Sequence, residues 1–466
     1  MILERFEDKG LSHYSYAVGC PGAGEVAIVD PRRDIDGYLA YAAREGLRIA
    51  YVLETHIHAD FASGAKALAE RTGAELWLSA YDDNELYETS FPHTEMRDGD
   101  SVTMGAIRVQ ALHTPGHTPE HLSFLVYDGN RSATVPMVML SGDFLFVGSL
   151  GRPDLLGDEA KRGLANRLYD SVTQKLAGLP DGLEVHPAHG AGSMCGAGMS
   201  GRPMSTLGFE RIANPYLDPA LTREAFVARI LGNVPPFPPY YRRMKVLNAA
   251  GPASLHTLPG SKALGPDEVA ARMADGAVLV DLAEQAQFGA GHVPGALGIG
   301  AGDSVSTWAS WVVPYDRSII LAAPDDATLD AAQRAFVRVG LDDLVGHLAG
   351  GTEAWAAAGH PLQSLPQWSP AALADHLDKG NGLLVLDVRN DDEFQAGHIS
   401  GARHLMGGYL AERLSELPRD AEIVVACRSG HRSTVAASVL LRAGFSRVGN
   451  LAGGLNAWRE AGLTVG

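Results

Sequence analysis

The chain is poor in cysteine and has no long hydrophobic run. Only three of its 466 residues are cysteines, Cys20, Cys195 and Cys427, and they lie far apart. This sparse, odd set argues against a disulfide framework and favours a reducing cytoplasm. No segment approaches the roughly 18 apolar residues of a membrane helix, and the opening MILERFEDKG has acidic residues where a signal peptide needs an apolar stretch. We therefore expect a cytoplasmic protein that is not inserted in a membrane.

Positive charge is also scarce. The chain has 38 Lys and Arg against 55 Asp and Glu, for a net charge of −17. This excess of acid disfavours a nucleic-acid or anionic-membrane partner, and an anionic substrate would have to be met by local positive charge. The composition is otherwise that of a folded protein, with 46% apolar residues and a mean hydropathy of −0.03. At about 150 residues per domain, the length predicts two to four domains.

The second half of the chain contains an internal repeat. VLVDLAEQAQFGAGHVPGALG (278–298) matches LVLDVRNDDEFQAGHISGA (384–402), and LAGGTEAW (348–355) matches LAGGLNAW (451–458). The matching segments lie about 100 residues apart, as expected for two homologous modules in tandem. Each alternates short Val/Ile/Leu runs with amphipathic segments, which predicts a parallel sheet wrapped by helices.

A proline-rich stretch separates this repeat from the first domain. Residues 231–262 carry LGNVPPFPPYYRRMKVLNAAGPASLHTLPG, which is typical of an extended connector. The aromatic residues Phe237, Tyr240 and Tyr241 could instead wall a neighbouring site. The predicted domains are 1–245, a linker 246–262, and two modules at 263–365 and 366–466.

The first domain combines short strands with clustered histidines. Runs such as IAYVLETH and MVMLSGD predict strands, and 63–72 and 158–177 predict helices, so we expect an α/β sandwich with its chemistry in loops at strand ends. Several His and Asp residues, each just after a strand, are better explained by a metal than by chance. They are His56, His58, Asp60, His113, His117, His121, Asp143, His186 and His189, of which His113 has no assigned role.

These residues resemble the metallo-β-lactamase superfamily, whose pattern is His-x-His-x-Asp-His with later His, Asp and His. The resemblance implies an αββα sandwich over about the first 230 residues. One position departs from the pattern: Phe61 stands where the dinuclear hydrolases have the last His of the first motif. Phenylalanine cannot bind a metal, so a second metal position would lose a ligand even though Asp60 and His189 remain. A mononuclear site is therefore favoured.

Within the superfamily, the domain looks like the persulfide dioxygenase branch. That resemblance implies metal binding by His56, His117 and Asp143. Two imidazoles and one carboxylate with open positions are typical of non-haem Fe(II) oxygenases, so we expect one Fe(II) per chain. O2 and a thiolate-type sulfur could then bind side by side. The residues expected to orient the ligands or guide protons are His58, Asp60, His121 and His189.

Three residues of this domain are candidate substrate contacts. Arg152 matches the Gly-Arg-x-Asp of persulfide dioxygenases and could meet an anionic substrate, although a structural bridge to Asp154 is an equal alternative. Tyr216 follows Asn-Pro where glutathione-using relatives often have an arginine, which puts glutathione itself in doubt. Cys195, in a glycine-rich loop six residues after His189, is a candidate sulfur acceptor, whereas we expect Cys20 to be structural.

The second module carries a nucleophile. Cys427 ends the strand IVVA and opens a tight loop onto a predicted helix, so it faces backbone N–H groups and a positive helix end, which should favour its thiolate or persulfide. The loop resembles that of rhodanese sulfurtransferases, and four residues between Cys and Arg fit sulfur transfer better than phosphate-ester hydrolysis. The catalytic candidates are Cys427, Arg428 and Arg432, with Ser429, Gly430 and His431 contacting substrate.

The first module lacks this equipment. Ala323 stands at the place of Cys427, Thr328 at the place of Arg432, and Ala283 replaces the strand-end arginine. Residues 263–365 are therefore predicted to be an inactive scaffold or docking module.

The whole chain resembles bacterial persulfide dioxygenase–rhodanese fusions. The resemblance implies oxidation of a thiol persulfide with O2 to sulfite, and sulfur exchange between thiosulfate or sulfite and a Cys427 persulfide. It also implies a homodimer or homotetramer. Two alternatives stay open: a zinc-dependent thioester hydrolase of the glyoxalase II type with a rhodanese tail, and a non-catalytic sulfur-relay or persulfide-sensing protein.

Overall fold

The computed structural model describes residues 1–380 and 382–466, which form two compact units. One comprises residues 1–256 with 337–340, and the other comprises residues 257–336 with 341–466. Each unit is described by itself.

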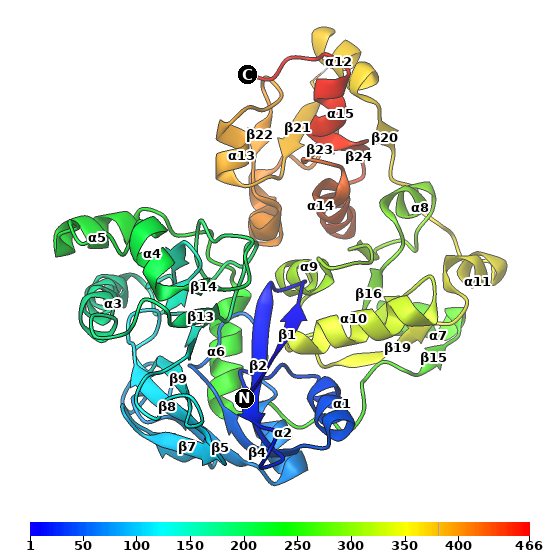
Figure 1. The fold of residues 1–466 in the computed structure, drawn as a ribbon. Helices are drawn as coiled ribbons and strands as arrows, with labels where there is room; N and C mark the ends of the chain where they lie inside the picture. Colours follow the sequence, from blue (N-terminus) through cyan, green and yellow to red (C-terminus); the bar gives the residue numbers. More distant parts are fainter. Residues whose placement is uncertain (381) are drawn as a thin grey trace. The chain divides into compact units, whose positions relative to one another are not determined.

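The N-terminal unit is built on two six-stranded mixed sheets (Figure 1). The first has the order β1-β2-β3-β4-β5-β6, with strands Ile2–Asp8, His13–Cys20, Glu25–Val29, Arg48–Leu53, Glu75–Ser79 and Thr94–Met96. The second has the order β14-β13-β10-β9-β8-β7, with strands Ser205–Thr206, Glu184–Pro187, Val138–Gly142, Leu122–Asp128, Ile107–His113 and Ser101–Met104. A small ribbon pairs β11 (Leu145–Phe146) with β12 (Ser149–Leu150).

Three apolar layers hold this unit together. Val18 and Leu53 of the first sheet meet Phe124 and Leu140 of the second in one buried cluster, so the two sheets pack face to face. Two further clusters cover the outer faces, one with α1 and α2 and the other with α3 and α5. The unit is therefore the expected αββα sandwich. The helices are α1 (Asp36–Glu45), α2 (Ala65–Thr72), α3 (Asp158–Asp170, continued by a π-helical turn Ser171–Lys175), α4 (Leu207–Ala213), α5 (Arg223–Leu231) and α6 (Tyr240–Ala250).

The C-terminal unit contains two parallel five-stranded sheets with equivalent strand order, which confirms the repeat. The first, β15-β19-β18-β16-β17, comprises Ala263–Leu264, Leu344–Leu348, Ile319–Ala322, Val278–Asp281 and Leu297–Gly298. The second, β20-β24-β23-β21-β22, comprises Gln367–Trp368, Val448–Leu451, Ile423–Ala426, Leu384–Asp387 and Arg403–His404. Short apolar strands of four or five residues lie at the centre of both sheets, as the Val/Ile/Leu runs predict.

Helices cover these sheets in corresponding places along the two modules. The first module has α7 (Pro266–Ala274), α8 (Gln285–Ala290), α9 (Val305–Val312), α10 (Asp326–Arg338) and α11 (Gly351–Ala357). The second has α12 (Pro370–Asp378), α13 (Asp391–Gln395), the 3-10 turns Gly407–Glu412 and Leu414–Glu416, α14 (His431–Arg442) and α15 (Gly454–Glu460). Among the described residues, no helix is both long and apolar enough to cross a membrane.

The proline-rich connector differs from a plain linker. Helix α6 runs from Tyr240 to Ala250, through residue 245 where the sequence placed the end of the first domain. Its Tyr240, Tyr241 and Met244 are buried. The prolines precede the helix, where their fixed φ and missing N–H do no harm to the helical hydrogen bonds.

The two modules differ in how they use the aspartate at the end of their second strand. In the second module, Asp387 pairs with Arg389, whose Nη2 lies 2.7 Å from Asp387 Oδ2. In the first module, Asp281 is 2% exposed, but Ala283 cannot supply the matching cation. Burial raises the pKa of Asp281 to about 6, although the Ala283 N–H bond to its carboxylate acts in the opposite direction.

This difference predicts opposite effects of two matched substitutions. The folded-state pKa of Asp281 lies above its unfolded value, so wild-type stability falls as pH rises through 4 to 6. Asp281→Asn should therefore raise the free energy of unfolding at pH 7 by about 1–3 kcal/mol, with the gain shrinking toward pH 4.

Asp387→Asn leaves Arg389 buried without its partner and should lower the free energy of unfolding by roughly 3–5 kcal/mol. Urea unfolding of the full-length Asp281→Asn and Asp387→Asn variants and the wild type, at pH 7 and pH 4, measures these changes in the free energy of unfolding. A loss of stability in Asp281→Asn at pH 7 would show that the carboxylate is compensated.

Candidate functional site

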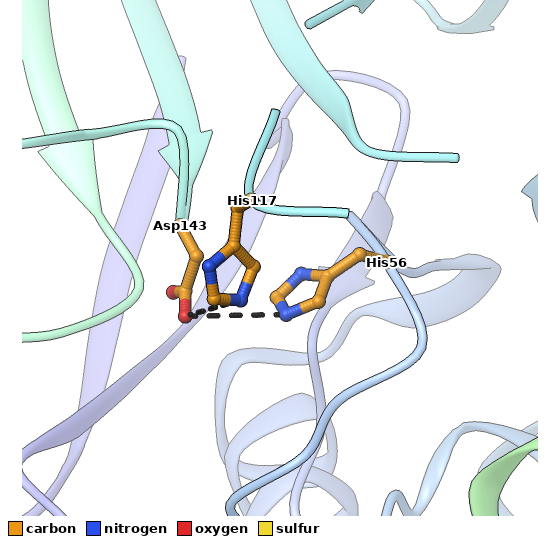
Figure 2. A group of neighbouring side chains, drawn as sticks. All are labelled: His56, His117 and Asp143. Atoms are coloured by element: carbon orange, nitrogen blue, oxygen red, sulfur yellow. Dashed lines mark ion pairs between the residues drawn. The ribbon is translucent and has the colours of Figure 1, made fainter. Parts of the chain in front are cut away.

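Three of the predicted metal ligands meet in the N-terminal unit (Figure 2). His56 follows β4, Asp143 follows β10, and His117 lies in the turn between β8 and β9. Asp143 Oδ2 is 3.3 Å from His117 Nε2 and 3.9 Å from His56 Nε2. Ligand atoms bonded to one cation at about 2.0–2.2 Å lie roughly 3 to 4 Å from one another. The spacing therefore fits a single metal ion.

The other nitrogen of each imidazole is held by the protein. His117 Nδ1 donates to the Arg152 carbonyl at 2.9 Å, and His56 Nδ1 is 2.9 Å from Thr55 Oγ1. A carbonyl only accepts, so this contact places the His117 proton on Nδ1 and leaves the Nε2 lone pair for a metal. Thr55 is fixed in turn by Asp30, which accepts from both its N–H and its hydroxyl.

The inward-facing atoms of this group are buried and lack hydrogen bonds. Within the described part of the chain, no N–H or O–H group donates to either oxygen of Asp143, and neither His56 Nε2 nor His117 Nε2 has a hydrogen-bond partner. Burial holds the pKa values of both imidazoles well below the usual range, and burial raises the pKa of Asp143 to about 6. Such orphaned groups are costly unless a cation satisfies them, so the residues fit a metal.

Two further predicted histidines adjoin the group in different ways. His121 Nε2 accepts the Asp143 backbone N–H at 3.0 Å and its Nδ1 lies 2.9 Å from Thr114 Oγ1, so both ring nitrogens are engaged. His58 Nε2 lies 3.2 Å from Asp30 Oδ1. Burial opposes the charged form of His58, but Asp30, Glu54 and Asp60 outweigh it and raise its pKa to about 9.

Asp60 and His189 lie on the other side of Asp143. His189 Nε2 is 3.2 Å from Asp60 Oδ2 and 3.6 Å from Asp143 Oδ1. Cys195 Sγ joins them in a second buried group of ligand-type atoms, all within 4.8 Å of one another. The structure thus brings four predicted residues, His56, His117, Asp60 and His189, around Asp143.

Two of the candidate substrate contacts, Arg152 and Tyr216, are engaged with other parts of the protein. Arg152 is 1% exposed and its guanidinium is fully engaged: it forms a two-point pair with Asp154 and donates to the carbonyls of Met194 and Pro236. Its own N–H donates to the Cys195 carbonyl, so it holds the Cys195 loop. Tyr216 packs on Phe226 in the outer cluster with α3 and α5.

Helix α6 supplies Tyr240, which the sequence offered as a possible wall of a neighbouring site, and also Asn248 and Lys245, which the sequence did not assign. Tyr240 Oη donates to the Asp60 carbonyl, and Asn248 Nδ2 donates to the carbonyls of His58 and Phe61. Lys245 is 2% exposed, with Nζ 3.9 Å from Glu120 Oε1. In the sequence, only the aromatic residues Tyr240 and Tyr241 of the connector pointed to these contacts with the loop after β4.

His13 was also missed. It lies on β2, its ring is 4.2 Å from that of Phe61 and 5.3 Å from that of His189, and it is fully buried. A single histidine in the strand HYSYAVGC carries no motif that would single it out.

The C-terminal unit presents the predicted nucleophile loop. Cys427 follows β23 directly, α14 begins at His431, and Cys427 is fully buried. The Gly430 N–H donates to Cys427 Sγ at 3.1 Å, and Ser433 Oγ lies 3.3 Å from it. Backbone donors at a helix start stabilise a negatively charged sulfur. Arg428 and Ser429 are exposed.

Two other residues of this loop are tied to neighbours. Arg432 Nη2 is 2.7 Å from Glu393 Oε1. His431 Nε2 donates to the Ile299 carbonyl of the first module at 2.9 Å. In that module, β18 ends at Ala322, so Ala323 takes the position equivalent to Cys427.

Fold and site together define a metal-binding domain of the metallo-β-lactamase type, joined to two modules of the rhodanese type. Residues 8–189 match the metallo-beta-lactamase superfamily, and residues 265–358 and 369–461 each match the rhodanese-like domain. The chain belongs to the metallo-β-lactamase superfamily and consists of such a domain followed by two tandem rhodanese domains. This arrangement is consistent with a persulfide dioxygenase–rhodanese fusion.

Three of the proteins that are similar to this chain have different described activities. A solved structure described as a metallo-beta-lactamase from Staphylococcus aureus is 33% identical, with a TM-score of 0.66 over 75% of this chain and 98% of that one. Human persulfide dioxygenase ETHE1 is 30% identical over 47% of this chain and 76% of its own length. A hydroxyacylglutathione hydrolase of Anaeromyxobacter dehalogenans is 32% identical over 47% of this chain and 86% of its own length.

A matched pair of histidine substitutions tests the metal group. His117→Gln removes an Nε2 that makes no hydrogen bond in the described part of the chain, so bound metal should fall to below about a tenth of the wild-type content. His186→Gln is the control, because His186 Nε2 instead contacts Glu184 Oε2 at 3.0 Å. Elemental analysis of the two purified full-length variants decides the matter. Full metal content in His117→Gln would contradict the ligand assignment.

Proposed function

We propose that the N-terminal domain is an Fe(II)-dependent dioxygenase that oxidises a low-molecular-weight thiol persulfide to sulfite, and that Cys427 carries sulfane sulfur as a rhodanese persulfide. The group formed by His56, His117 and Asp143 carries this proposal, since two imidazoles and one carboxylate are the ligand set of non-haem Fe(II) oxygenases. When bound, one iron per chain would supply O2 activation and a site for sulfur.

The proposed reaction balances as R–S–SH + O2 + H2O giving R–SH + SO3²⁻ + 2 H⁺. The terminal sulfur is oxidised, O2 is reduced, and the S–S bond breaks to release the thiol. The chain's residues must orient the imidazole ligands, exclude bulk water and take up the released protons. The hydrogen bonds of His56 to Thr55 Oγ1 and of His117 to the Arg152 carbonyl perform the first task, and the complete burial of His117 and Asp143 serves the second.

The second step occurs at the rhodanese loop. A Cys427 persulfide transfers its outer sulfur to sulfite, Cys–S–S⁻ + SO3²⁻ giving Cys–S⁻ + S2O3²⁻, and the reverse reaction reloads the cysteine. The Gly430 N–H is positioned to stabilise the negative sulfur in both states. Arg428, Ser429 and Arg432 are the proposed anion contacts, with His431 positioned by the Ile299 carbonyl.

The proposal also covers the setting of the reaction. Cys20, Cys195 and Cys427 are all free thiols, as expected in a reducing cytoplasm. A homo-oligomer remains a prediction.

The rival activity is hydrolysis of a thioester by a zinc-loaded site. It is favoured by the hydroxyacylglutathione hydrolase relative, whose identity to this chain equals that of the persulfide dioxygenase within a few percent. Oxygen-electrode assays of iron-loaded protein, with persulfides of glutathione and coenzyme A, should show persulfide-dependent O2 uptake. Zinc-loaded protein with a 2-hydroxyacyl thioester of glutathione should show no cleavage. Thioester cleavage without O2 uptake would replace the proposal with the hydrolase.

Two cysteine substitutions test whether the metal site and the rhodanese loop act independently. Cys427→Ser should lower thiosulfate-to-thiol sulfur transfer at least about 100-fold, because the nucleophile is lost, and should leave O2 uptake within about twofold of wild type. Cys20→Ser, in β2 of the N-terminal unit, should change neither rate. Loss of both activities in Cys427→Ser would contradict two independent sites.

A further inference from the structure

The end of α10 belongs to the N-terminal unit, although its sequence lies within the first rhodanese match. Residues 337–340 group with residues 1–256, whereas residues 265–358 match the rhodanese-like domain. The packing is close, because a Cβ atom at Gly340 would lie only 2.8 Å from Met244 Cε on α6. Neither half of the proposed chemistry uses this segment, so its place in the N-terminal unit needs its own explanation.

The guanidinium of Arg338 joins two carboxylates of the N-terminal unit. Its Nε and Nη2 donate to the two oxygens of Asp34 at 2.7 and 2.6 Å, and its Nη1 donates to Asp8 Oδ2 at 3.0 Å. The side chains of Arg338, Asp34 and Asp8 are 18%, 6% and 3% exposed. A two-point guanidinium–carboxylate pair shielded from water is strong and fixes both partners in one orientation.

The backbone of Arg338 holds the loop after β4. Its carbonyl accepts the Ala62 N–H at 2.7 Å. The groups on either side of this N–H are held by α6, because Asn248 donates to the Phe61 carbonyl and accepts from the Ser63 N–H. The loop that follows His56 and carries His58 is therefore fixed jointly by α6 and by the end of α10.

Asp34 lies in a segment that also orients a metal-ligand candidate. Four residues earlier, Asp30 accepts from the N–H and the hydroxyl of Thr55, and Thr55 Oγ1 in turn accepts from His56 Nδ1. The same Asp30 lies 3.2 Å from His58 Nε2. A shift of this segment would thus move the partner that sets the orientation of the His56 ring.

Asp8 lies in a turn that contacts another histidine of the site. Its Oδ1 accepts from the Gly10 and Leu11 N–H groups, which shapes the turn between β1 and β2. In that turn, the Ser12 carbonyl accepts from His189 Nδ1 at 3.2 Å. The guanidinium and the carbonyl of one arginine therefore connect three separate loops around the metal group.

We propose that Arg338, which lies in the sequence of the first rhodanese module, is a positioning residue for the metal group of His56, His117 and Asp143. It acts through Asp34, Asp8 and the Ala62 N–H on the loops that orient the imidazoles. A module without a sulfurtransferase nucleophile would then serve the metal site of the other domain. This inference rests on metal binding by that group, and it holds for the dioxygenase and for the thioester hydrolase alike.

Cobalt titration of metal-free, full-length protein tests this role without turnover. The visible absorption of bound Co²⁺ that is lost in His117→Gln reports the metal group. Arg338→Met keeps a long side chain but removes the guanidinium, so it should raise the Kd for Co²⁺ at least about 10-fold and change the visible spectrum. Arg338→Lys keeps the charge without the two-point pair, so its Kd should lie between those of Arg338→Met and wild type.

Two control variants separate positioning from general stability. Val227→Ala loosens the outer apolar cluster with α3 and α5, so its urea midpoint should fall while its Kd for Co²⁺ stays within about twofold of wild type. Arg272→Met, in the first rhodanese module, removes an arginine that pairs with Glu268 at the surface, and should change neither value.

An unchanged Kd and spectrum in Arg338→Met would overturn the proposal, and so would an equal rise in Kd in Val227→Ala. If Arg338→Met fails to fold, as judged by circular dichroism, Asp34→Asn weakens the same pair and should raise the Kd at least about threefold; an unchanged Kd there would also overturn the proposal. Cobalt binding is independent of O2 uptake. Failure of the dioxygenase assay would leave this result standing, and the reverse also holds.

Discussion

The structure of the N-terminal unit depends on one electrostatic constraint: a set of carboxylates and imidazoles is buried between two sheets without enough hydrogen bonds. Asp143 lies at its centre, fully buried, with both oxygens facing imidazoles. Burying such groups unpaired costs several kcal/mol each, and a bound cation would offset that cost. The hydrogen bonds that His56 donates to Thr55, His117 to the Arg152 carbonyl and the Asp143 N–H to His121 fix the orientation of these three residues.

The same constraint explains why helix α6 belongs to this unit. Asn248 and Tyr240 satisfy the backbone carbonyls of the loop that carries His58, Asp60 and Phe61. A helix that follows a proline-rich connector therefore fixes the ligand geometry from outside.

Sequence reasoning reached the parts that depend on local pattern. Strand-end histidines, the Cys427 loop and the tandem repeat all follow from short motifs, and the structure shows them in the expected architecture. Contacts between segments that lie far apart in the chain could not be predicted, because no local sequence pattern encodes them. Nothing in the segments HYSYAVGC and YYRRMKVLN indicates that His13 contacts Phe61 or that Asn248 binds the carbonyls of the loop after β4. The proximity of Cys195 to His189 in sequence was a hint, but its convergence with Asp60 is tertiary.

The central claim is that the buried triad supports oxidation of a persulfide. Its most direct measurement is the stoichiometry of a single assay on iron-loaded Cys427→Ser protein, which cannot pass sulfite on to thiosulfate; O2 consumed, sulfite formed and free thiol released are determined together. The account predicts equal amounts of all three from the balanced reaction. Thiol release without O2 consumption, or O2 consumption without sulfite, would contradict it.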